Sequence, residues 1–261
     1  MRQRILTAVI GVPLLIGTVY FDPLYARLAF ALIAFLALQE LQAALININL
    51  KVQPVLLIIY LGICFLDLDP LMTRLPLYFS LYLLAILSYF AYKYPKYSLE
   101  QLSVNLLVAV YPAWPLLYAL KLRLLPDDGS AALLLVFLLT WAYDTFAYIG
   151  GMLMGKHRPF GALSPSKSIE GVVWGTLGTV ITAFSFNYFC PTFQPYLVLG
   201  LGLGAALFAQ VGDLAESALK RYCGIKDSGK LLPGHGGFLD RFDAFSFVAV
   251  LVYLVYSLRG I

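Results

Sequence analysis

Four aspartates in the second half of the chain lie inside or beside apolar segments. Asp144 has apolar residues on both sides, Asp213 lies near the end of one apolar run, and Asp240 and Asp243 begin another. A charged residue deep in an apolar helix costs roughly 2.5–3.5 kcal/mol and usually marks a site. Acids that converge at one depth repel each other unless a cation joins them. We therefore expect these four carboxylates to bind a hard divalent metal ion. The alternative for Asp144 is a structural pair with a nearby lysine.

Two polar segments, residues 155–170 and 217–243, carry the positive charge and many of the glycines near these acids. Glycine lets backbone N–H groups approach an anion, and Lys and Arg neutralise its charge. Carboxylates that bind a metal beside such a surface are typical of phosphoryl or nucleotidyl transfer. Such a reaction depends on positioning and electrostatics and needs no side-chain nucleophile. The alternative, that these charges only contact anionic lipid headgroups, leaves the embedded acids unexplained.

The composition indicates the solvent in which these residues must be positioned. Of the 261 residues, 61% are hydrophobic and 12% are charged, against roughly 45–50% and about 25% in soluble globular proteins. A chain of this length cannot bury so much apolar surface from water. The composition therefore excludes a soluble enzyme and a disordered chain. The net charge of +4 is scattered and small, which excludes a nucleic-acid binder.

Apolar runs of about 20 residues, the length that a membrane helix needs, predict an all-α polytopic membrane protein with about nine transmembrane helices. The predicted spans are residues 5–21, 24–46, 53–70, 75–92, 102–120, 130–154, 170–189, 196–214 and 243–259. Pro112 and Pro115 lie inside the fifth run, so this helix should kink or break.

The basic residues predict the orientation, because cytoplasmic loops carry an excess of Lys and Arg. With a cytoplasmic N-terminus, thirteen of the 18 Lys and Arg residues face the cytoplasm and five face outward. The acids then lie at membrane depth below cationic cytoplasmic loops. One substrate should be soluble and strongly anionic, and the other should be a lipid with a phosphate head.

The chain is expected to divide into two regions. Residues 1–125 would form transmembrane helices that serve as scaffold, dimer contact or lipid-facing surface, and residues 126–261 would form the catalytic region with cytoplasmic loops 155–170 and 217–243. Glu40, within the second span, could serve the site. A helix–helix hydrogen bond with Gln39 or Gln42 is the simpler interpretation.

The segment from Ser217 to Asp243 resembles the signature of phosphatidate cytidylyltransferases (CDP-diacylglycerol synthases). It contains Ser217-Ala218-Leu219-Lys220-Arg221, Lys226-Asp227-Ser228-Gly229 and Leu232-Pro233-Gly234-His235-Gly236-Gly237-Phe238-Leu239-Asp240-Arg241-Phe242-Asp243. The segments 141–148 and 164–171 also resemble motifs of this family. The N-terminal half matches the family in size and hydropathy only.

The resemblance implies transfer of the cytidylyl group of CTP to phosphatidate, which gives CDP-diacylglycerol and pyrophosphate, with Mg²⁺ and an open number of cations. It implies Asp213 and Asp240 as the leading metal ligands, followed by Asp243 and Asp144. His235 would assist proton transfer or cap the glycine turn. The residues implied to bind the triphosphate or the lipid phosphate are Ser164, Lys167, Ser168, Ser217, Lys220, Arg221, Lys226, Gly236, Gly237 and Arg241. The resemblance also implies a homodimer in the cell membrane with its active site facing the cytoplasm.

Three other functions fit parts of the pattern. A related CTP-dependent lipid kinase or an isoprenoid-lipid cytidylyltransferase would use a similar site, although the spacing of the 217–243 motif favours the phosphatidate enzyme. A CDP-alcohol phosphatidyltransferase would carry a different string of acids, which is absent. An ion-coupled transporter could use embedded acids as relays. It would be expected to show internal repeats, and we find none in the sequence.

Overall fold

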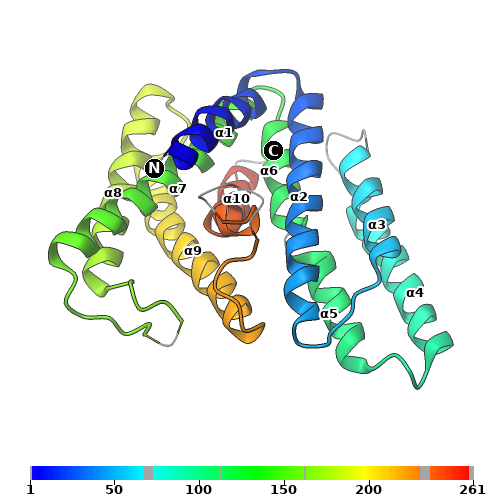
Figure 1. The fold of residues 1–261 in the computed structure, drawn as a ribbon. Helices are drawn as coiled ribbons and strands as arrows, with labels where there is room; N and C mark the ends of the chain where they lie inside the picture. The colour runs from blue at the N-terminus through cyan, green and yellow to red at the C-terminus, as the bar shows by residue number, and fades with distance from the viewer. Residues whose placement is uncertain (1, 68–72, 112, 162, 230–235, 259–261) are drawn as a thin grey trace.

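The computed structural model describes residues 2–67, 73–111, 113–161, 163–229 and 236–258. These residues form ten α-helices and their connections (Figure 1). The helices are α1 (Arg2–Tyr20), α2 (Pro23–Ile46), α3 (Pro54–Leu66), α4 (Leu75–Lys93), α5 (Leu99–Val110), α6 (Ala113–Arg123), α7 (Gly129–Met154), α8 (Ile169–Phe189), α9 (Pro195–Tyr222) and α10 (Leu239–Ser257). The prediction of an all-α protein is confirmed for these residues.

Polar caps and prolines begin several of the helices. Asp22 accepts a backbone N–H at the start of α2, whose first residue is Pro23. Ser98 and Gln101 form a capping box at the start of α5, and Ser168 caps α8. Such residues satisfy N–H groups that have no partner within the helix, and proline is tolerated in the first turn. This is why helices begin where the apolar runs are interrupted in the sequence.

The fifth apolar run forms two helices instead of one. α5 ends at Val110 and α6 begins at Ala113, with Pro112 outside the described residues and Pro115 in the first turn of α6. Proline lacks an N–H group and its ring clashes with the preceding turn, so it ends a helix. The predicted break is confirmed.

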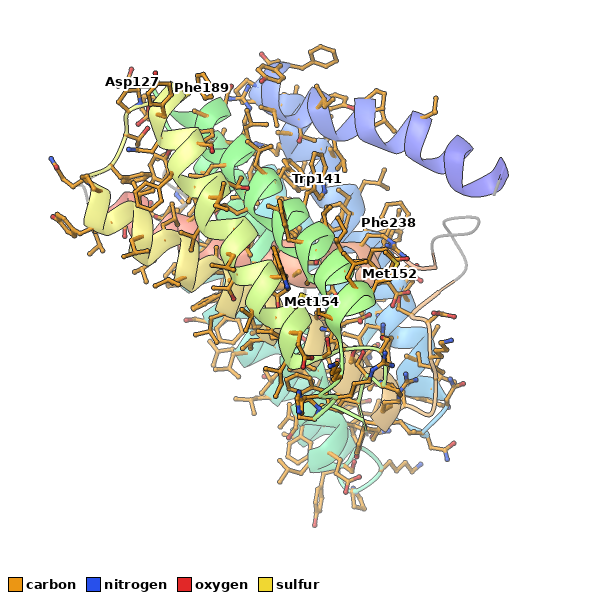
Figure 2. All side chains as sticks on the ribbon, turned by 90° about the vertical axis from the view of Figure 1, so that its left-hand side faces the viewer. Asp127, Trp141, Met152, Met154, Phe189 and Phe238 are labelled. Carbon is orange, nitrogen blue, oxygen red and sulfur yellow. The ribbon has the colours of Figure 1, made fainter. Side chains whose placement is uncertain are left out.

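The helices of the second half pack along one another. α7 lies against α8, and α9 contacts both α8 and α10. Asp127 and Phe189 lie together at one end of the α7–α8 pair and Met154 lies toward the other, so these helices are antiparallel (Figure 2). A Cβ atom at Gly175 of α8 would meet the ring of Tyr143 on α7 at 2.9 Å. The absence of a side chain at Gly175 therefore allows the close packing of these two helices.

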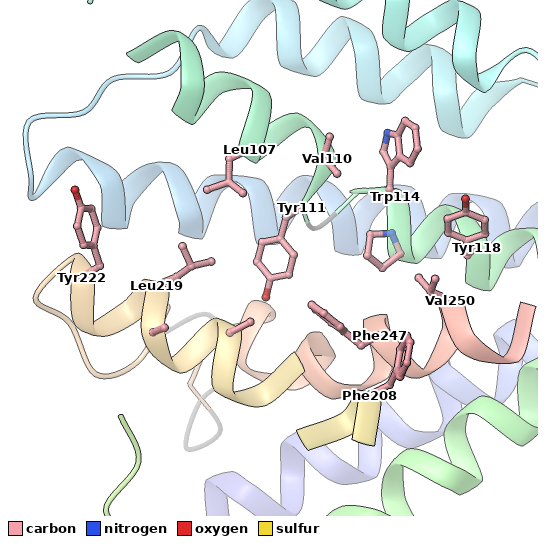
Figure 3. Close-up of a pocket in the computed structure, with 13 residues that line it drawn as sticks. Leu107, Val110, Tyr111, Trp114, Tyr118, Phe208, Leu219, Tyr222, Phe247 and Val250 are labelled. Carbon is pink, nitrogen blue, oxygen red and sulfur yellow. The ribbon is translucent and has the colours of Figure 1, made fainter. Parts of the chain in front are cut away.

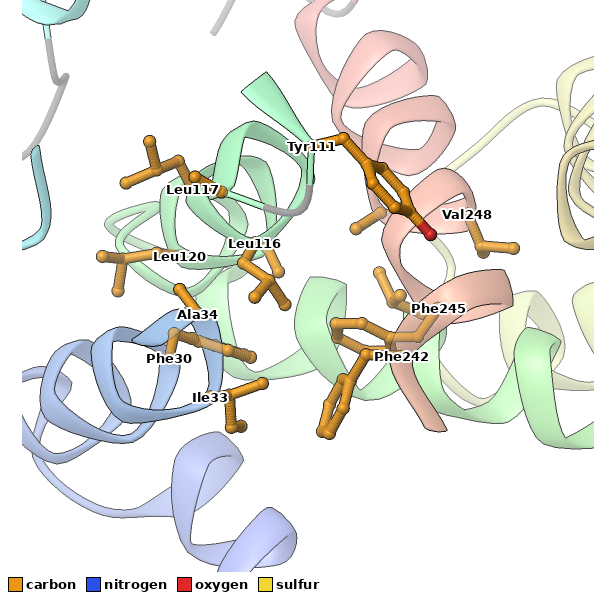
Figure 4. Close-up of a cluster of buried hydrophobic side chains, with 14 of the residues drawn as sticks. Phe30, Ile33, Ala34, Tyr111, Leu116, Leu117, Leu120, Phe242, Phe245 and Val248 are labelled. Atoms are coloured by element: carbon orange, nitrogen blue, oxygen red, sulfur yellow. The ribbon is translucent and has the colours of Figure 1, made fainter. Parts of the chain in front are cut away.

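α10 lies between the helices of the first half and those of the second (Figure 1). Its Phe245 packs against Phe30 of α2, with ring centroids 6.2 Å apart, and against Phe137 of α7, with centroids 4.7 Å apart. Leu116 and Leu120 of α6 are fully buried in the same cluster (Figure 4). This apolar core fixes the start of α10, which carries two of the predicted acids.

Among the described residues, six segments, five single helices and one helix pair, are long and apolar enough to cross a membrane. They are α2, α4, the α5–α6 pair taken together, α7, α8 and α9. The nine predicted spans stay a prediction: α3, at Pro54–Leu66, has 13 residues where the span 53–70 was expected, and residues 68–70 lie outside the described part of the chain. α1 lies obliquely across the other helices and is not aligned with them (Figure 1).

The connections alternate between two ends of the molecule. Those that follow α2, α4, α7 and α9 lie at one end, and those that follow α1, α6 and α8 lie at the opposite end (Figure 1). We call the first the basic end, defined by residues 47–53, 94–98, 155–161, 163–168 and 223–229, because it carries most of the Lys and Arg residues of the described loops.

Candidate active site

The predicted acids come together from three helices. Asp144 of α7 and Asp213 of α9 each lie about ten residues, or roughly 15 Å, from the helix end that faces the basic end. The charges of Asp144, Asp213 and Asp243 of α10 act on one another. Acids from α7, α9 and α10 thus lie near enough for their charges to interact, whereas their common depth in the membrane and their binding of a metal stay predictions.

One lysine from the loop before α8 pairs with a predicted acid at this site. Lys167, from the loop before α8, forms an ion pair with Asp213, and the charges of Lys167 and Arg241 both act on Asp144. Among the described residues, no three His, Cys, Asp or Glu side chains are arranged closely enough to hold one metal ion. The donor set of three converging carboxylates nevertheless has the oxygen chemistry that a hard divalent cation requires.

Lys220 joins two acids in the interior of the site. Its ammonium group lies 2.5 Å from Glu216, one helical turn earlier on α9, and 2.6 Å from Asp240 on α10. The side chain of Glu216 is fully buried, and that of Asp240 is 10% exposed. An ammonium group between two buried carboxylates offsets charges that would otherwise be very costly to bury.

Asp240 also binds both described ends of the glycine-rich loop, residues 228–237, of which residues 230–235 lie outside the described part of the chain. Its Oδ2 atom accepts the backbone N–H groups of Ser228, at 3.0 Å, and of Gly237, at 2.9 Å. Gly236 has a φ of +84°, a conformation that side chains disfavour, and a Cβ atom there would lie 2.8 Å from Asp240. Asp240 therefore accepts hydrogen bonds from three protein groups, those of Lys220, Ser228 and Gly237. Among the described residues, Asp243 accepts one, from the adjacent N–H of Ala244.

Glu40 approaches the same loop from the first half of the chain. It is 4% exposed and accepts hydrogen bonds from the Ser228 hydroxyl and from the backbone N–H groups of Phe238 and Leu239, each at 3.0 Å. The simpler sequence interpretation, a bond with Gln39 or Gln42, is wrong, because the Glu40 carboxylate is directed to residues 228–239.

The second polar loop is fixed by Glu170. Its carboxylate accepts the backbone N–H groups of Lys156 and His157, at 3.1 and 3.2 Å, and lies 2.6 Å from the His157 ring nitrogen. Ser168 accepts the Gly171 N–H at 3.1 Å as the cap of α8, and it is buried. These bonds hold the chain so that Lys167, between them, reaches Asp213.

The remaining predicted residues lie around this centre. Ser217 is buried on α9. Arg221 donates to the Ile225 carbonyl at 3.1 Å, and Ser164 lies in a turn in which its N–H bonds to the Phe160 carbonyl at 2.7 Å. Lys226 and Arg241 are exposed. His235 lies outside the described residues.

Sequence reasoning missed Glu216, although a signal for it was present. Asp213, Glu216 and Lys220 are separated by three and four residues, which places them on one face of a helix. The carboxyl group of Glu216 is adjacent in space to Asp240 through their shared lysine. For Glu40 the only signal was an acid within an apolar helix, and no local spacing connects it with a loop 188 residues later.

An apolar cavity of about 800 Å³ lies beside the acids, between the α5–α6 break and helices α9 and α10 (Figure 3). Tyr111 lines this cavity, and its hydroxyl is directed away from α5 toward α10 (Figure 3). The hydroxyl is buried without a hydrogen-bond partner among the described residues, and the charges of Glu216 and Asp243 act on it. The remaining lining residues are Leu107, Val110, Trp114, Pro115, Tyr118, Phe208, Ala215, Ala218, Leu219, Tyr222, Phe247 and Val250.

Comparison with known proteins assigns the chain to a family. Residues 2–259 match the cytidylyltransferase family. A phosphatidate cytidylyltransferase of Staphylococcus saprophyticus is 33% identical over an alignment of 268 positions, which covers 98% of this chain and 98% of the relative. Phosphatidate cytidylyltransferases of Staphylococcus aureus (strain COL) and Staphylococcus haemolyticus are 37% and 38% identical over 171 residues, 65% of this chain and of each relative. In those two comparisons the match spans just under two thirds of the relative's length. The chain belongs to the cytidylyltransferase family.

Proposed function

We propose that this protein transfers the cytidylyl group of CTP to phosphatidate, which gives CDP-diacylglycerol and pyrophosphate. The observation that carries this proposal is the match of residues 2–259 to the cytidylyltransferase family, with a relative of that activity covering 98% of the chain. A phosphate oxygen of phosphatidate attacks the α-phosphorus of CTP, the bond between the α-phosphorus and its bridging oxygen breaks, and pyrophosphate leaves.

The chain's own residues supply charge and position for this transfer. Asp144, Asp213 and Asp243 are the proposed ligands of Mg²⁺, and Asp240 completes the set through its one less occupied oxygen. The bound cation would neutralise phosphate charge and orient the in-line displacement. The residues proposed to contact the triphosphate or the lipid phosphate are Ser164, Lys167, Ser168, Ser217, Lys220, Arg221, Lys226, Gly236, Gly237 and Arg241. His235 stays a candidate for proton transfer.

The apolar cavity is the proposed place for the acyl chains of the lipid substrate. Its volume of about 800 Å³ lies in the range of ligand cavities, and its lining residues expose almost no polar atoms. The Tyr111 hydroxyl is directed toward α10 (Figure 3), and the charges of Glu216 and Asp243 act on it. It would donate a hydrogen bond to the lipid where the acyl chains join the phosphate head.

The membrane arrangement also belongs to the proposal. The concentration of basic loops at one end supports a cytoplasmic N-terminus and active site. The proposal of nine spans in the cell membrane rests on the apolar runs of the sequence. The homodimer implied by the family resemblance is retained on that ground alone.

The test is a turnover assay with purified protein in mixed micelles, α-labelled CTP, Mg²⁺ and phosphatidate. We expect a labelled, chloroform-soluble product and one pyrophosphate per product molecule. A parallel reaction with isoprenyl phosphate in place of phosphatidate addresses the isoprenoid alternative, and γ-labelled CTP addresses the kinase. Product from isoprenyl phosphate alone, or transfer of the γ-label to lipid, would refute the proposal.

A further inference from the structure

We propose that Glu40 of α2 is a positioning residue for the reaction, because it holds Ser228 and the start of α10 in the arrangement that places Asp240. This inference rests on the proposed function for its catalytic readout. It assigns a role in the site to the first half of the chain, for which the sequence predicts scaffold, dimer contact or lipid-facing surface and offers Glu40 only as an isolated acid in an apolar helix.

The contacts of Glu40 are unusual for an acid near the end of a membrane helix. Oε1 accepts the Phe238 N–H, and Oε2 accepts both the Leu239 N–H and the Ser228 hydroxyl, all at 3.0 Å. No lysine or arginine forms an ion pair with it among the described residues. The carboxylate is therefore stabilised by hydrogen-bond donors of the loop and of the start of α10. Hydrogen bonds to a charged group are stronger than those between neutral groups.

Two glycines of the loop leave room for this carboxylate. A Cβ atom at Gly229 would contact the Glu40 carboxyl group, and a Cβ atom at Gly237 would contact both Glu40 and the Ser228 hydroxyl. The loop is thus closely packed around Glu40 on both of its described ends. The side chain is enclosed by residues that belong to the family-like motif, which distinguishes it from an incidental helix contact.

Glu40 and Asp240 bind the same loop from different helices. Ser228 donates its hydroxyl to Glu40 and its backbone N–H to Asp240. Gly237 donates to Asp240, while the next two N–H groups donate to Glu40. Asp240 continues through Lys220 to Glu216. A continuous set of bonds therefore runs from α2 to α9, and loss of Glu40 should free Asp240 and the loop together.

The experiment compares Glu40→Gln with the matched control Glu100→Gln, which makes the same change at an exposed position of α5. The first readout is hydrogen exchange of peptides that cover residues 224–239 in the purified protein. We expect exchange in Glu40→Gln to be faster by about tenfold or more, because the amide group replaces an acceptor oxygen with a donor. Peptides from residues 93–101 should exchange as in the wild type.

The second readout is CDP-diacylglycerol synthesis per folded molecule. We expect kcat to fall about 10- to 100-fold with a smaller change in KM, since misplaced groups weaken transition-state contacts most. The milder variant Ser228→Ala should show the same pattern to a lesser degree. The double variant should lose less than the product of the two single losses, because both remove one shared bond.

Three results would overturn this proposal. Unchanged exchange in residues 224–239 would show that Glu40 does not hold the loop. Exchange that rises throughout the chain would reveal a general structural role. Losses of kcat that multiply in the double variant would show that Glu40 and Ser228 act independently. If the wild type makes no CDP-diacylglycerol, the proposed function fails, yet hydrogen exchange still tests the contact between Glu40 and the loop.

Discussion

Replacement of Lys220 by methionine should destabilise the protein strongly. The substitution keeps most of the side chain's volume and removes the ammonium group that lies 2.5 Å from Glu216 and 2.6 Å from Asp240. Asp240 keeps two backbone donors, from Ser228 and Gly237. Glu216 has no other hydrogen-bond donor among the described residues, and its side chain is fully buried. The loss of the ammonium group therefore leaves mainly the buried Glu216 carboxylate without compensation.

The size of the effect follows from this asymmetry. Removal of one partner from a buried ion pair costs about 3–5 kcal/mol, because the other charge stays buried without compensation. For a soluble domain of 150–250 residues, each 1 kcal/mol lowers Tm by about 2–4 °C. If the same scale holds in detergent, Lys220→Met should lower Tm by about 6–20 °C.

Thermal unfolding of the purified variants in one detergent measures this loss. Lys96→Met, at an exposed position, is the control and should leave Tm unchanged within about 1 °C, since isolated surface charges contribute little. Adding Glu216→Gln to Lys220→Met removes the uncompensated charge and should restore at least half of the lost Tm. A Tm of Lys220→Met equal to that of the control, or no recovery in the double variant, would refute this account of the buried charges.

Three further predictions concern activity. Gly237→Ala should lower the rate of CDP-diacylglycerol synthesis about tenfold or more, because its Cβ atom would contact Glu40 and Ser228, whereas Gly161→Ala, whose nearest neighbouring atom lies 4.0 Å away, should keep it; equal activities would contradict the packing argument. Ala218→Phe should fill part of the apolar cavity and raise the KM for long-chain phosphatidate several-fold, which corresponds to a loss of about 1 kcal/mol or more of binding free energy. The KM for a dihexanoyl form should not change. Equal effects on both lipids would show that the acyl chains do not bind in this cavity. Chelation with EDTA should abolish turnover and excess Mg²⁺ should restore it; activity that survives exhaustive chelation would exclude a required divalent cation.

The sequence predicted the helices well where hydrophobicity and turn residues agree. The range 130–154 became Gly129–Met154, and 170–189 became Ile169–Phe189. Agreement is weaker where a helix continues past the apolar run. α9 extends to Tyr222 instead of residue 214, and α10 begins at Leu239 instead of residue 243. Apolar runs predict the part of a helix in contact with lipid, whereas backbone hydrogen bonds continue through polar residues with good helix propensity.

The candidate site could be predicted only where its residues share a helix or a motif. The spacing of Asp240 and Asp243 and the lysines of the two loops could be recognised locally. The pairing of Lys167 with Asp213, and of Lys220 with both Glu216 and Asp240, depends on how the helices pack. The contact between Glu40 and residues 228–239 could not be predicted, because no local periodicity connects residues that are 188–199 positions apart.

That separation has a consequence for the order of synthesis. Ser228 and Leu239 follow Glu40 by 188 and 199 residues, and a ribosome that adds about 5–20 residues per second needs roughly 10–40 s to make them. During this interval α2 is already made and carries an acid without its final partners. Glu40 lies six residues before the end of α2 at Ile46, or about 9 Å from that end, so it is closer to the end of this helix than to its start. A chain that stops before residue 228 would leave this acid without the three donors that stabilise it in the folded protein, from Ser228, Phe238 and Leu239.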